Sequence, residues 1–162
     1  MARIYLGLGS NIEPAANLRL AARELRARFG KIGLSSVYRS APVGFQGDDF
    51  LNMVVSAETE LAPHEVVREL DAIHRVAGRE RDGGKLLPRT LDIDLLLYDD
   101  QIADDAGVQL PRDDVLDYPF VLRPLAELAP DYVHPLTGRT LHDHWRNFDG
   151  QSIKLTKESV RV

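Results

Sequence analysis

The stretch TLDIDLLLY, residues 90–98, decides the fold because it completes a recurring order of secondary-structure elements. It is an apolar run that predicts a strand, and it follows segments that predict a strand, a helix, two strands and a second helix. In chain order, these predicted elements cover residues 2–9, 14–30, 31–40, 50–60, 62–78 and 90–98. The order βαββαβ predicts an α+β fold with a ferredoxin-like core, in which both helices pack on one face of a mainly antiparallel sheet.

The two predicted helices carry clear start and stop signals. In the first, Leu18 and Leu25 lie on one apolar face at helical spacing, and Gly30 follows as a stop. In the second, Pro63 suits the first turn and Gly78 suits the end. We therefore expect the second helix to end at Gly78.

The residues after 98 predict C-terminal additions to this core. Residues 108–130 predict a loop that feeds a short, proline-interrupted helix, and residues 141–148 predict a further helical turn. Residues 151–162 alternate only weakly and fit either an edge strand or a loose end. The length of 162 residues is that of one ordinary domain, so residues 1–162 are expected to form a single domain.

The composition excludes several classes of protein. A net charge of -5 argues against a general nucleic-acid surface, which normally needs an excess of basic residues. The absence of cysteine removes disulfides and thiolate metal sites. No apolar run reaches the roughly 18 residues of a membrane span, and the first residues lack the pattern of a signal peptide. We expect a cytoplasmic protein that acts as a monomer.

Two carboxylates stand at the head of the strand in residues 90–98. Because side chains alternate along a strand, Asp92 and Asp94 share one face roughly 7 Å apart. The apolar residues expected on the opposite, core face are Leu91, Ile93, Leu95 and Leu97. Two carboxylates this close favour a cation between them, and hard oxygen ligands suit Mg²⁺. A solvated strand face near a sheet end fits the bare pattern as well.

A basic segment precedes that strand. Residues 74–89, HRVAGRERDGGKLLPR, hold Arg75, Arg79, Arg81, Lys85 and Arg89 against only two acidic residues. Arginine forks suit phosphate oxygens, and the paired glycines at 83 and 84 predict a loop from 79 to 85 that closes over a polyphosphate. An exposed loop that its charges merely solvate is the alternative.

Two further stretches invite a ligand-binding interpretation. GLGSN, residues 7–11, lacks the complete pattern of either phosphate-binding glycine loop and predicts a strand-to-helix turn with a cap donor. Phe50 and Asn52 supply an aromatic face and an amide that would suit a flat heterocycle with several hydrogen-bonding edges. Taken alone, Phe50 favours a place in the core over a ligand contact.

These stretches together resemble the 6-hydroxymethyl-7,8-dihydropterin pyrophosphokinase family, over about residues 3–130. The resemblance is carried by GLGSN, YRSAPVG, FLN, GRER, PRTLDIDLLL and FVLRPLAELAP, of which PRTLDIDLL is the most specific. It implies transfer of pyrophosphate from ATP to a pterin alcohol, with release of AMP. ATP and the pterin are then the small-molecule substrates, and two Mg²⁺ ions are the cofactors.

The resemblance also implies roles for individual residues. Asp92 and Asp94 match the ligands of the two Mg²⁺ ions, and the arginines that embrace the triphosphate match Arg79, Arg81 and Arg89. Those five residues form the implied catalytic set. Leu95 and Arg112 fall on the ATP side. The implied pterin residues are Ser40, Ala41, Val43, Phe50, Asn52 and Phe120, the two phenylalanines as an aromatic sandwich.

Four positions depart from the family pattern, all on the nucleotide side. His74 replaces a usual glutamate, Leu86 a frequent tryptophan, Arg112 a frequent histidine and Tyr118 an arginine. Two other functions stay open, the first because of these departures and the second because polymerase-like palms also set two carboxylates on a ferredoxin-like sheet. One is a pterin-binding paralogue that has lost or altered nucleotide turnover, and the other is a two-metal nucleotidyltransferase, which would release pyrophosphate instead of AMP.

Overall fold

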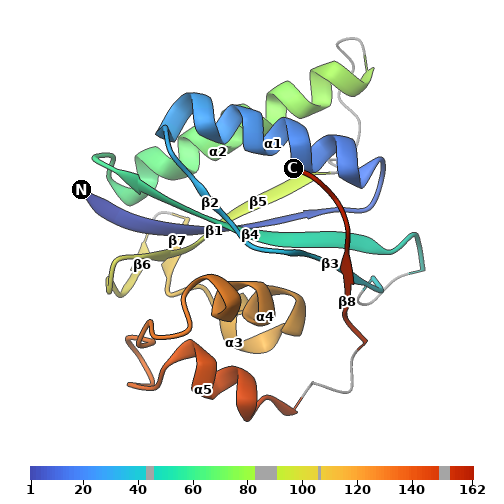
Figure 1. Cartoon of the computed structure of the whole chain (residues 1–162). Helices are drawn as coiled ribbons and strands as arrows, with labels where there is room; N and C mark the ends of the chain where they lie inside the picture. Colours follow the sequence, from blue (N-terminus) through green and yellow to red (C-terminus); the bar gives the residue numbers. More distant parts are fainter. Residues whose placement is uncertain (43–45, 83–90, 106, 150–153) are drawn as a thin grey trace.

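In the computed structural model, a six-stranded antiparallel sheet lies between two layers of helices (Figure 1). The structure describes residues 1–42, 46–82, 91–105, 107–149 and 154–162, and of residues 79–82 only the backbone. The strand order is β5-β1-β4-β3-β8, and β2 also pairs with β4. The strands of this sheet are β1 (Ala2–Ser10), β2 (Gly33–Leu34), β3 (Val37–Ser40), β4 (Phe50–Thr59), β5 (Leu91–Tyr98) and β8 (Thr156–Glu158). A separate hairpin joins β6 (Ala103–Asp105) to β7 (Val108–Leu110).

Helices cover both faces of the sheet. Figure 1 shows α1 (Pro14–Phe29) and α2 (Pro63–Asp82) together on one face, as the sequence predicted. The opposite face carries α3 (Asp114–Asp117), α4 (Pro119–Leu128) and α5 (Leu141–Arg146). Each layer has its own apolar core, because alternate strand residues point to opposite faces. None of the described helices combines the length and apolarity that a membrane span needs.

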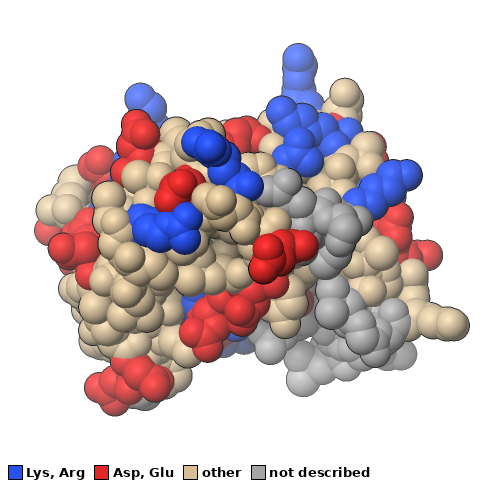
Figure 2. Space-filling view, turned by 90° about the horizontal axis from the view of Figure 1, so that it is seen from below, with Lys and Arg blue, Asp and Glu red and all other residues tan. Residues whose placement is uncertain are grey.

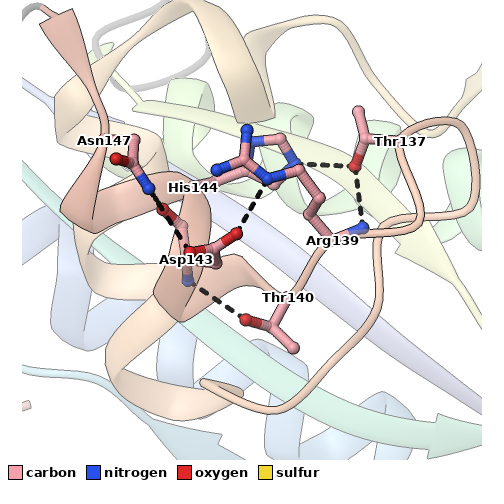
Figure 3. Close-up of polar contacts among 6 residues, drawn as sticks. All are labelled: Thr137, Arg139, Thr140, Asp143, His144 and Asn147. Carbon is pink, nitrogen blue, oxygen red and sulfur yellow. Dashed lines mark hydrogen bonds and ion pairs between the residues drawn. The ribbon is translucent and has the colours of Figure 1, made fainter.

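The second layer ends in a well-bonded turn around α5. The Thr140 hydroxyl accepts a hydrogen bond from the Asp143 N–H at 3.1 Å, and the Asp143 carboxylate accepts one from Arg139 at 2.8 Å (Figure 3). Thr137 and His144 are joined by a hydrogen bond of 2.7 Å. The bond to Thr140 satisfies a free N–H group at the start of this short helix, and the other two join side chains around it. Figure 2 views the molecule from the side of α5 and shows both acidic and basic side chains there.

The structure confirms the predicted boundaries of α1 and corrects those of α2. The first helix ends at Phe29, where Gly30 has a φ of 78° that suits glycine. The second continues through Gly78 to Asp82, since one helical glycine costs only about 1 kcal/mol and good helix formers follow it. The backbone of Arg79 and Arg81 therefore belongs to a helix and not to the predicted loop.

The strand β5 follows the predicted alternation only in part. Ile93 lies in the core beneath α1 and α2, as expected, but the register against β1 shifts so that Leu95 faces Leu6 and Leu97 faces Tyr5. Both Leu96 and Leu97 are consequently buried in the second core. The prediction that Leu97 shares the face of Ile93 was wrong, because a bulge inserts one residue and reverses the alternation.

Several local predictions also change. Residues 7–10 belong to β1 and not to a turn, and Glu13, at the start of α1, makes no side-chain cap bond. Residues 31–40 form two strands, because the backbone and hydroxyl of Ser35 both bond to Val54 between them. The hairpin β6–β7 was not predicted. Of the two alternatives for the C-terminal stretch, the structure has the edge strand, with Lys157 opposite Tyr38.

Candidate active site

A cavity of about 290 Å³ opens on the face of the sheet that α4 partly covers. It brings together residues that the sequence assigned separately to pterin and to metal. Those predicted residues are Ser40, Ala41, Phe50, Asn52, Asp92, Asp94 and Phe120. Val43 lies outside the described residues. The two carboxylates thus share a cavity with the proposed heterocycle pocket.

Two glycines of the central strand β1, Gly7 and Gly9, contribute to the lining of this cavity. A side chain at Gly9 would come within 3.4 Å of the Asn52 carbonyl oxygen and 3.8 Å of the Phe50 ring. Sequence reasoning missed both residues as functional candidates. Alternate glycines inside a strand signal a close approach of another group, and that signal was available in GLGS.

Asn52 is a buried amide whose orientation is fixed by the protein. Its amino group donates to the Ser40 hydroxyl at 2.8 Å and to the Tyr38 carbonyl at 3.2 Å. Its carbonyl oxygen lies on the side of Gly9. Neighbouring strands supply these partners, since Tyr38 on β3 pairs with Asn52 on β4. The amide is therefore preorganised for a planar ligand with donor groups along one edge.

An aromatic pair at the start of α4 forms another part of the wall. The rings of Tyr118 and Phe120 are stacked, with centroids 5.0 Å apart and an interplanar angle of 20°. Pro119 between them begins the helix, which suits its fixed φ. Phe50 lines the same cavity from β4. Tyr118 stands where the family pattern has an arginine, and here its ring forms part of the aromatic wall.

The carboxylates near β5 form a small charged cluster with one arginine. Burial raises the pKa of Asp94, the nearby Arg112 acts to lower it, and Asp92 and Asp114 add to the rise. Arg112 lies 3.8 Å from an Asp94 oxygen and 3.2 Å from an Asp114 oxygen. Asp114 also lines the cavity and was not predicted. Because Arg112 is shared between Asp94 and Asp114, an additional cation near Asp94 would be favourable.

The donor chemistry at this cluster fits Mg²⁺. Among the described residues, no three or more His, Cys, Asp or Glu side chains are arranged to hold a metal by themselves. Magnesium commonly takes one or two carboxylates and completes its shell with water and substrate phosphates. Asp92 and Asp94 offer such a partial set of oxygen ligands.

A second, smaller cavity of about 150 Å³ lies between α2, β5 and β7. Leu95 and Arg112, both predicted for the ATP side, line it together with His74 and Gln109. Asp94 lines this cavity as well as the larger one. One carboxylate thus joins a pocket with an aromatic wall to a pocket lined by the predicted nucleotide residues.

Some predicted site residues cannot be placed in either cavity. Arg79 and Arg81 lie in the last turn of α2, and only their backbone is described. Arg89 and Leu86 fall outside the described residues. Their assignment to the triphosphate stays a prediction.

Comparison with known proteins gives concordant matches. A family model for 7,8-dihydro-6-hydroxymethylpterin-pyrophosphokinase (HPPK) matches residues 5–130. The 2-amino-4-hydroxy-6-hydroxymethyldihydropteridine pyrophosphokinase of Methylorubrum extorquens is 39% identical over 158 residues, covering 95% of this chain and 98% of that protein. The protein of the same name from Aquifex aeolicus is 34% identical, covering 88% of this chain and 90% of its own length.

Solved structures agree at the level of the fold. A crystal structure of wild-type Plasmodium falciparum HPPK-DHPS with pterin and p-hydroxybenzoate matches with a TM-score of 0.80 at 13% identity. The match covers 96% of this chain and 46% of that longer chain. Family membership follows from the family model and from the two relatives, which are more than 30% identical over nearly all of their own length. The chain belongs to the 7,8-dihydro-6-hydroxymethylpterin-pyrophosphokinase family.

Proposed function

We propose that this chain transfers the pyrophosphoryl group of ATP to 6-hydroxymethyl-7,8-dihydropterin, giving the pterin diphosphate and AMP, in folate biosynthesis. Beside the family membership, one structural observation carries the proposal. Asp94 lines both the cavity with the aromatic wall and the smaller cavity beside Leu95 and Arg112. Two substrates in these cavities would meet at a carboxylate suited to hold a metal.

The pterin is proposed to lie in the larger cavity. Its rings would stack between Phe50 and Phe120, and the amide of Asn52 would bond to its polar edge. Ser40 and Ala41, with Val43 beyond them in the chain, would complete the pocket. The fixed orientation of the Asn52 amide supports this assignment, because an amide already held in place loses little freedom on binding.

The triphosphate is proposed to lie beside Asp92 and Asp94. These two carboxylates would hold two Mg²⁺ ions, which when bound offset the negative charge of the phosphate oxygens. Arg79, Arg81 and Arg89 would contact the phosphates, and Arg112 would contribute from the far side of Asp94. The raised pKa of Asp94 supports the assignment, because a buried carboxylate with acidic neighbours is stabilised by added cations.

The reaction follows from this placement. The hydroxymethyl oxygen attacks the β-phosphorus in line, the bond from that phosphorus to the bridging oxygen of the α-phosphate breaks, and AMP leaves. The hydroxyl proton passes to solvent. The chain contributes by orienting the two substrates and by neutralising charge, which are the main protein contributions to phosphoryl transfer.

The nucleoside is proposed to lie in the smaller cavity, with the base against Leu95 and Leu70. Gln109 and His74 offer polar groups at its margin. The architecture behind both cavities is proposed to be a ferredoxin-like core of β1 to β5 with α1 and α2, followed by C-terminal additions within one domain. The strand order β5-β1-β4-β3 supports this description.

The test is to identify the products formed from ATP, the reduced pterin and Mg²⁺. The proposal expects AMP and pterin diphosphate in equal amounts. Release of pyrophosphate with a nucleotidylated pterin would instead identify a nucleotidyltransferase. Tight pterin binding with neither product would identify a pterin-binding protein without turnover.

A further inference from the structure

Strand β5 is an edge strand at the point where it carries the two carboxylates. In the part of the chain that the structure describes, β5 pairs with β1 on one side only. At Ile93 a side chain takes the place of a second strand. The Ile93 N–H donates to Nε2 of His74 on α2 at 2.9 Å, in a buried position. His74 itself is only 9% exposed.

The hydrogen bond defines the protonation of the His74 ring. A nitrogen that accepts a hydrogen bond carries no proton, so the neutral ring bears its proton on Nδ1. That nitrogen lies 3.6 Å from a carboxylate oxygen of Asp71, one helical turn earlier on α2. The His74 ring thus contacts Ile93 of β5 through Nε2 and lies near Asp71 of its own helix through Nδ1.

The residue held by His74 lies between the two proposed metal ligands. The Ile93 side chain is 2% exposed and points into the core beneath α1 and α2. Asp92 and Asp94, on either side of it, line the larger cavity on the opposite face. Because the side-chain period of a strand is two, a slip at Ile93 would turn both carboxylates away from the cavity.

We propose that His74 is a positioning residue for the Asp92 and Asp94 pair. It holds the edge of β5 at Ile93 and thereby fixes the distance and direction of both carboxylates toward bound Mg²⁺ and phosphate. This inference rests on the proposed function, since it deepens the metal assignment at that site.

Three variants separate positioning from other roles of His74. His74→Ala leaves the buried Ile93 N–H without its acceptor, whereas His74→Gln keeps a side-chain oxygen in reach of it. Gln109→Ala is the matched control, because Gln109 lines the same smaller cavity but bonds to Asp113 and not to β5. Circular dichroism establishes that each variant is folded.

The kinetic readout is the Mg²⁺ concentration for half-maximal AMP formation at saturating ATP. For His74→Ala we expect a rise of about fivefold or more, the effect of an unpaired buried donor, with the pterin KM within about twofold of the parent. His74→Gln should recover most of the loss, and Gln109→Ala should shift the ATP KM without shifting the Mg²⁺ requirement. Equal impairment by His74→Gln, or an equal Mg²⁺ shift in Gln109→Ala, overturns the proposal.

A second readout does not depend on turnover. Nuclear magnetic resonance of the labelled parent protein should show a coupling across the hydrogen bond between the Ile93 amide nitrogen and His74 Nε2. Its absence overturns the proposal whether or not AMP is formed. If the coupling is present but the parent makes no AMP, the proposed function fails separately. Mn²⁺ binding then replaces the kinetic readout, and His74→Ala must weaken it about fivefold or the positioning role falls as well.

Discussion

Asp94 is the residue at which the two cavities meet, and its environment disfavours its own charge. Burial is the main cause of its raised pKa, Arg112 acts to lower that pKa, and Asp92 and Asp114 add to the rise. For an acid with a raised pKa, the charged form destabilises the folded state. This destabilisation is absent below the unfolded-state pKa of about 4 and fully present above the raised folded-state pKa. The charged form of Asp94 therefore lowers the stability of the ligand-free protein, and the proposed cations would offset this cost.

Replacing Asp94 with asparagine should separate these two effects. We expect Asp94→Asn to raise the thermal midpoint of the ligand-free protein at pH 7, while AMP formation falls by about a hundredfold or more because a charged metal ligand is lost. The gain in midpoint should shrink as the pH is lowered toward about 4, where the parent carboxylate becomes protonated. Thermal melts over this pH range, with Asp104→Asn on the exposed hairpin as control, provide the measurement. A lower midpoint at pH 7 would refute the electrostatic argument.

Tyr118, which replaces an arginine of the family pattern, makes an aromatic contact with Phe120. Its ring stacks on Phe120, and an offset aromatic pair contributes roughly 0.5–1.5 kcal/mol beyond area burial. Tyr118→Ala should therefore weaken pterin binding about twofold to tenfold, while Tyr118→Phe, which keeps the ring, should bind as the parent does. Fluorescence titration with the pterin checks both variants. Loss confined to ATP binding would place Tyr118 on the nucleotide side instead.

At the scale of elements, one acidic residue of α4 links this helix to β3 and to the residue just before it. Glu127 accepts hydrogen bonds from the Ser36 N–H at 2.7 Å, the Ser36 hydroxyl at 3.0 Å and the Tyr38 hydroxyl at 2.5 Å. Burial acts against its charge, but these bonds outweigh burial and hold the pKa of Glu127 below its usual range. Since β3 ends at Ser40, the contact links α4 to the cavity proposed for the pterin.

Glu127→Ala should destabilise the protein by about 1–3 kcal/mol at pH 7, because the nearly buried Tyr38 hydroxyl loses its acceptor. A lowered acid pKa contributes stability above the unfolded-state value of about 4.3, and that contribution is lost as the pH falls through the folded-state pKa. The difference from the parent should accordingly shrink in acid. Denaturant unfolding is the measurement. Glu58→Ala, which removes an exposed ion pair to Arg3, should change stability little. A similar loss in both variants would contradict the account.

The elements that sequence could predict are those with strong local signals. The helix from Pro14 to Phe29 has a proline start, a periodic apolar face and a glycine stop, and it is found as expected. Gly78 carries the same stop signal, but the helix α2 continues through it to Asp82. A single glycine in a helix is tolerated when good helix formers lie on both sides. The bulge at Leu96 has no local signal, since the run of leucines fits either face.

At the scale of the whole molecule, the candidate site was predictable where it coincides with a specific motif. PRTLDIDLL and FLN supplied Asp92, Asp94, Phe50 and Asn52, and the structure brings these residues to one cavity. Gly9 was missed although the alternate glycines of GLGS carry a signal of close approach. Asp114 was missed because it acquires its place only when α3 comes beside β5. Non-local proximity of this kind depends on tertiary packing and is absent from short-range patterns.

The central claim is that the Asp92 and Asp94 pair holds the metal between a pterin and a nucleotide. A crystal structure with Mn²⁺, the pterin and α,β-methylene-ATP, in which the bond to be broken is blocked, tests it most directly. We predict anomalous peaks within coordination distance of both carboxylates, with the pterin between Phe50 and Phe120 and the base beside Leu95. Metal held without either carboxylate, or a pterin seated elsewhere, would contradict the account.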